Sequence, residues 1–153
     1  MAIPLAVAHR LGRTPISRMR RLCFAAFTLL VVQYGLGTGV NLFVTVPKSD
    51  TDIGKTIRNG PLVLSLHAVI GVLLVFTAIA LIVLAARAGA RLVLGGAVLG
   101  ALAMAAAAAA GSAFVRTGAN SASMAMGMAA GVGLLCYGMA LFALGERAAR
   151  PVE

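Results

Sequence analysis

Four long apolar segments dominate the sequence and limit what the chain can fold into. They cover about residues 22–46, 62–86, 92–115 and 119–145, and each has at least the roughly 20 residues that an α-helix needs to cross a bilayer. The chain has 61% apolar and 11% charged residues, whereas soluble domains have about 25% charged residues. The sequence therefore predicts an all-α fold: an integral membrane protein built as an antiparallel four-helix bundle.

The basic residues predict how this bundle is oriented. Four spans place both termini on one side of the membrane, and Lys and Arg accumulate on the cytoplasmic side. With the termini in the cytoplasm, nine basic residues lie inside (Arg10, Arg13, Arg18, Arg20, Arg21, Arg87, Arg91, Arg147, Arg150) and four outside (Lys48, Lys55, Arg58, Arg116). High contents of Ala, Gly, Val and Arg suggest a bacterium with a GC-rich genome. We therefore expect a multi-pass protein of the bacterial cytoplasmic (inner) membrane, N-in and C-in. Residues 1–21 form its basic cytoplasmic segment, 22–145 the membrane domain and 146–153 the cytoplasmic tail.

The first span carries an unusual polar and glycine-rich stretch. Gln33, Gly37 and Asn41 follow at i, i+4 and i+8, so they share one helix face, and Gly35 and Gly39 form a GxxxG pair on an adjoining face. An unpaired amide in hydrocarbon costs several kcal/mol. We expect this small, polar side to face partner helices. Those helices belong either to the same chain or to a homo-oligomer or larger membrane complex.

His67 is the titratable residue of the second span, and an ionisable group inside a span is a candidate for function. Its ring can ligate haem iron, bond a quinone carbonyl or move a proton. With Gln33 and Asn41 it forms a candidate cofactor site, with haem b as one cofactor. The alternative is a neutral histidine that donates to Asn41 or Ser65 and joins the first two spans.

A second candidate site lies at the outer start of the fourth span. Arg116, Asn120 and Ser123 gather there, where a helix N-terminus and a guanidinium group favour an anionic headgroup or carboxylate. Arg116 can equally serve as an anchor at the membrane interface. No metal site is predicted, because the methionines near residue 124 have the spacing of core packing.

Two stretches resemble known families. The segment from Gln33 to Gly39, followed by a polar loop and then by Leu66 to Leu74, resembles one four-helix half of heme A synthase and is similar to cytochrome b561-like bundles. That resemblance implies a haem-ligand role for His67, although the synthase has two such halves and several ligating histidines. The segment from Arg116 to Met124 resembles small four-span membrane proteins of actinobacterial type, a group with no assigned activity.

These observations leave three functional hypotheses. The chain shows no nucleophile-elbow, P-loop or zinc-hydrolase motif, and no RNA-binding motif accompanies its arginines, so we expect neither an enzyme nor a nucleic-acid partner. The first hypothesis is a structural or accessory subunit, or a binder of a lipid or hydrophobic cofactor, with its polar cluster in the outer half of the bundle. The second is a haem- or quinone-linked redox component that uses His67, and the third is a small transporter.

Overall fold

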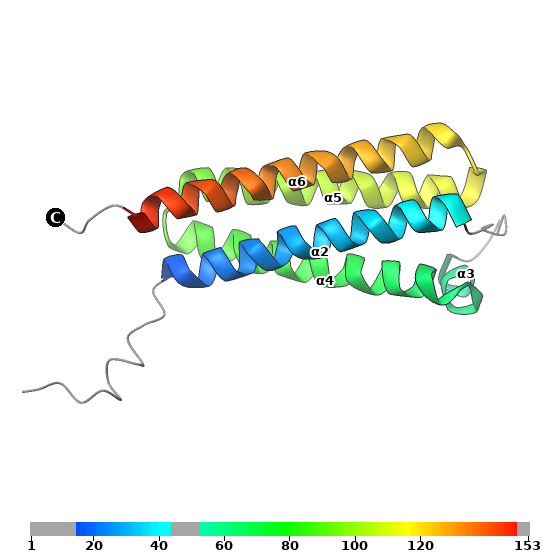
Figure 1. The fold of residues 1–153 in the computed structure, drawn as a ribbon, viewed down its shortest axis with the longest axis horizontal. Coiled ribbons are helices and arrows are strands. Elements are labelled where there is room, and N and C mark those ends of the chain that lie inside the picture. The colour runs from blue at the N-terminus through cyan, green and yellow to red at the C-terminus, as the bar shows by residue number, and fades with distance from the viewer. Residues whose placement is uncertain (1–14, 44–52, 150–153) are drawn as a thin grey trace, which may run out of the picture.

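The computed structural model describes residues 15–43 and 53–149, which form helices joined by short turns (Figure 1). In chain order the helices are α2 (Pro15–Phe43), α3 (Ile53–Asn59), α4 (Leu62–Arg87), α5 (Arg91–Thr117) and α6 (Asn120–Ala149). Four of them, α2, α4, α5 and α6, are long and apolar enough to cross a membrane. The prediction of an all-α chain with four helices of membrane-spanning length and apolarity is confirmed.

The helix boundaries follow local chemistry. Proline suits the first turn of a helix, because its missing N–H would have no partner there, and Pro15 begins α2. The chain leaves α4 through Gly89, whose φ of +61° is easy for glycine, and the next N–H, that of Ala90, reaches back to the Ala85 carbonyl at 3.0 Å. Gly118, with φ of +66°, makes the equivalent turn between α5 and α6.

The four long helices lie side by side, and each runs back along the one before it (Figure 1). The largest contact is between α5 and α6; α2 contacts both α4 and α6, and α4 also contacts α5. Each long helix thus has two principal neighbours. The short helix α3 packs on the end of α4, where the Ser65 hydroxyl donates to the Ile57 carbonyl at 2.8 Å.

The contact between α2 and α4 has one continuous register. A Cβ added to Gly37 would lie 3.0 Å from Cε1 of His67, and one added to Gly71 would lie 3.3 Å from Nε2 of Gln33. Extended along both helices, this register brings buried positions level with each other, for example Leu30 with Leu74. The buried positions of α2 recur in steps of three, four or seven, which fits the heptad spacing of a coiled coil.

Glycines also set the contact between α5 and α6. A Cβ on Gly100 would lie 2.9 Å from Cε2 and Cζ of the Tyr137 ring, and one on Gly96 would lie 3.1 Å from the carbonyl oxygen of Cys136. Both glycines therefore occupy positions where the facing helix leaves no room for a side chain. This is the close approach that small residues allow between membrane helices.

Many of the side chains buried between the helices are small, whereas many of those on the outer surface are large. Its fully buried core includes five alanines (Ala26, Ala85, Ala90, Ala97, Ala140), whereas Phe24, Phe76 and Phe142 are 62%, 66% and 70% exposed. A soluble protein rarely exposes apolar surface on this scale, but lipid tails are as apolar as these side chains. The exposed surface therefore fits a hydrocarbon environment.

Candidate functional site

Gln33 and His67 lie in the same two turns of the contact between α2 and α4. The Gln33 amide packs against Gly71, and the His67 ring packs against Gly37, with the main chain of Gln33 also beside the ring. Each polar side chain therefore fills the space that a glycine leaves on the facing helix. The expectation that the Gln33 face of the first span meets a partner helix agrees with this geometry, and that helix is α4 of the same chain.

Two polar atoms at this contact lack partners. Oε1 of Gln33 and Nδ1 of His67 are buried, and neither has a hydrogen-bond partner among the residues that the structure describes. A buried polar atom without a partner costs about 1–3 kcal/mol. Oε1 can accept a hydrogen bond, and Nδ1 can donate or accept according to the tautomer. The contact therefore leaves one acceptor and one ring nitrogen that can donate or accept unused between the two helices.

The predicted structural partners of His67 are engaged or placed elsewhere. The Ser65 hydroxyl donates to the Ile57 carbonyl, and Asn41 is exposed near the end of α2. The structure therefore brings together two of the three residues of the predicted cofactor site, Gln33 and His67. Asn41 lies two turns beyond Gln33 along α2.

The second candidate site lies around the turn between α5 and α6. Arg116 and Asn120 are exposed, and Ser123 is partly buried on the first turns of α6. The turn itself is closed by Thr117, whose Oγ1 accepts a hydrogen bond from the N–H of Ala119 at 3.2 Å. The role of Arg116, Asn120 and Ser123 in binding a headgroup stays a prediction.

The GxxxG pair of the first span lies apart from the contact between α2 and α4. A Cβ on Gly35 or Gly39 would meet nothing within 4 Å, whereas Gly37 is buried against His67. Among the described residues, the glycine of α2 that packs closely against α4 is thus Gly37, which lies between Gly35 and Gly39 in the sequence. The hypothesis that Gly35 and Gly39 join a second chain stays a prediction.

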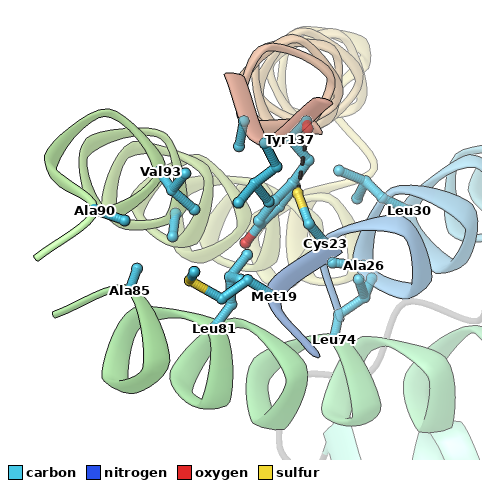
Figure 2. Close-up of a cluster of buried hydrophobic side chains, with 13 residues drawn as sticks. Met19, Cys23, Ala26, Leu30, Leu74, Leu81, Ala85, Ala90, Val93 and Tyr137 are labelled. Carbon is cyan, nitrogen blue, oxygen red and sulfur yellow. Dashed lines mark hydrogen bonds between the residues drawn. The ribbon is translucent and has the colours of Figure 1, made fainter. Parts of the chain in front are cut away.

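A third buried polar group lies deeper in the bundle, at the end where α2 begins. Tyr137 of α6 is fully buried, and Figure 2 shows its ring reaching into the core among the labelled Met19, Leu81 and Val93. Its carbonyl accepts a hydrogen bond from Sγ of Cys23 at 3.4 Å, but its hydroxyl has no partner among the described residues. Sequence reasoning did not single out Tyr137.

Sequence reasoning also missed Gly71, although a signal was available. The second span contains His67 and Gly71 at i and i+4, which repeats the spacing of Gln33 and Gly37 in the first span. A polar residue one turn before a glycine on each of two antiparallel helices allows each polar side chain to pack on the other helix's glycine. Comparing the two spans would have found this pairing.

Fold and site together define a class: a helical chain with four segments able to span a membrane and a polar contact between the first two. No family model, curated protein or solved structure matches the chain.

Proposed function

We propose that this chain is a non-enzymatic accessory protein of the bacterial cytoplasmic membrane that binds a hydrophobic ligand between α2 and α4. In this proposal the four long helices cross the bilayer as an antiparallel bundle with both termini in the cytoplasm. The distribution of basic side chains supports this orientation. Among the described residues, the end where α2 begins carries Arg18, Arg20, Arg21, Arg87, Arg91 and Arg147, and the other end carries Lys55, Arg58 and Arg116.

The observation that carries the proposal is the pair of unpartnered atoms, Oε1 of Gln33 and Nδ1 of His67. A contact that served packing alone would be expected to satisfy or to avoid such atoms, because hydrocarbon supplies no replacement hydrogen bonds. A ligand with a hydrogen-bonding head group would satisfy both atoms and keep its tail in lipid. A lipid, or a cofactor such as a quinone, has this chemistry.

The second candidate function is a haem- or quinone-linked redox component. It is favoured by Nδ1 of His67, which has no hydrogen-bond partner among the described residues, because histidine nitrogens bind haem iron. The other axial ligand would have to come from a methionine or from a second subunit, since His9 belongs to the cytoplasmic segment.

The test is to identify what copurifies with the protein. The wild-type chain, His67→Ala and Gln33→Leu would be purified in mild detergent, their spectra recorded oxidised and reduced, and their organic extracts analysed by mass spectrometry. We expect a bound lipid or quinone in the wild type and a loss of about tenfold or more in both variants, because each removes one of two hydrogen bonds. Thr77→Val is the control, since that hydroxyl bonds its own helix at the Leu73 carbonyl.

Each other outcome has a definite meaning. A Soret band that is present in the wild type and absent from His67→Ala would show a haem protein and overturn the first proposal. Equal extracts from the wild type and both site variants would overturn ligand binding at this contact. Melting temperatures measured alongside would separate loss of ligand from loss of fold.

A further inference from the structure

A groove opens between α2 and α4 at the end of the pair opposite His67. It has a volume of about 320 Å³ and is lined by Ser17, Arg18, Arg21 and Leu22 of α2 and by Leu84 of α4. The described residues that line it include two arginines and no acidic side chain. The groove thus combines two positive charges with two partly buried leucines.

The groove lies where the apolar part of α2 gives way to its basic first turns. Arg18 and Arg21 are three positions apart and therefore neighbours on one helix face. Both are exposed, whereas Leu22 and Leu84 are partly buried between the helices. A molecule in the groove would meet guanidinium groups at its polar end and leucine side chains at its apolar end.

From this arrangement we infer that the groove binds the phosphate group of an anionic phospholipid. Guanidinium groups bind phosphate through paired N–H donors, and arginines at a membrane surface attract anionic lipids. The two leucines would contact the start of an acyl chain, which free phosphate lacks. This lipid site is separate from the ligand site at Gln33 and His67, and either inference can fail without the other.

Native mass spectrometry of the purified full-length protein can test this inference. The protein would be titrated with phosphatidylglycerol, with phosphatidylcholine and with inorganic phosphate. The test variant is Arg18→Gln/Arg21→Gln. Its matched control is Arg20→Gln/Arg87→Gln, which removes two exposed arginines from the same end of the bundle but none from the groove.

We expect the wild type and the control to bind one phosphatidylglycerol molecule more tightly than phosphatidylcholine. The test variant should lose on the order of thirtyfold in that affinity, and each single substitution about fivefold. Equal losses in the two double variants would overturn the site and leave only general attraction of charge. Inorganic phosphate binding as tightly as the lipid would show an anion site without a lipid role.

Discussion

The hydroxyl of Tyr137 is a polar atom held in an apolar core. The residue has no exposed surface, and its hydroxyl has no hydrogen-bond partner among the described residues. The Cys23 thiol donates to the main-chain carbonyl of Tyr137 and not to this hydroxyl. The ring itself is needed, because it fills the space above Gly100. The ring and its hydroxyl group therefore make opposite contributions to stability.

Replacing Tyr137 by phenylalanine separates these contributions. We expect Tyr137→Phe to be neutral or to raise the free energy of unfolding by about 1 kcal/mol, because it removes a buried hydroxyl without a partner. Tyr137→Ala should lower it by about 3–5 kcal/mol. The measurement is reversible unfolding in mixed detergent micelles, with Tyr34→Phe, an exposed position, as the control. A clear loss of stability in Tyr137→Phe would show that a water or ligand bonds the hydroxyl.

The sequence predicts which residues form the candidate site but not how they are brought together. The face that carries Gln33 and Gly37 follows from helix periodicity alone, and His67 stands out as an ionisable residue in a span. The level of His67 relative to Gly37 does not follow, because it depends on how two helices slide against each other. That register rests on side-chain packing along the whole of both helices.

At the scale of the elements, apolar length locates the spans well. The predicted segment 62–86 becomes α4 at Leu62–Arg87, and 92–115 becomes α5 at Arg91–Thr117. The predicted first span begins at 22, but α2 begins at Pro15, because arginine is a good helix former and a helix need not end where its apolar run ends. The prediction for residues 44–46 falls outside the described part of the chain.

The short helix α3 was not predicted. Its seven residues lie in a stretch that was interpreted as a polar loop, and an isolated helix of that length is unstable in water. Packing against α4 and the bond from Ser65 to the Ile57 carbonyl hold it in place. These are tertiary contacts, and the hydropathy of the sequence does not predict them.

The close packing of α5 against α6 requires glycine at the positions where the two helices touch. The substitution Gly100→Ala tests this requirement. Its new Cβ would lie 2.9 Å from the Tyr137 ring, and the buried ring has little room to move, so we expect unfolding to become easier by about 1–3 kcal/mol. Gly95→Ala on the same helix is the matched control, because its Cβ would meet nothing within 4 Å. Equal stability of the two variants would mean that α5 and α6 do not pack as closely as the structure indicates.

For the whole molecule, the arrangement of small and large side chains and the arrangement of charge agree. Five buried alanines, with Gly37, Gly96 and Gly100, lie between the helices, while Phe24, Phe76 and Phe142 lie outside, which suits lipid. Arginines concentrate at the end where α2 begins and α6 ends. The first pattern supports a membrane location and the second an orientation, so the two can be tested separately.

Labelling of single cysteines tests the orientation. In a background with Cys23→Ala and Cys136→Ala, cysteines would be placed at Ala88, in the turn between α4 and α5, and at Thr117, at the end of α5; both positions are exposed. A membrane-impermeant maleimide applied to intact bacterial cells should label Thr117→Cys and leave Ala88→Cys unlabelled, because arginine-rich turns stay in the cytoplasm. Disrupting the cells should make both positions reactive. The reverse pattern would place both termini outside, and labelling of both in intact cells would show that the four helices do not all cross the bilayer.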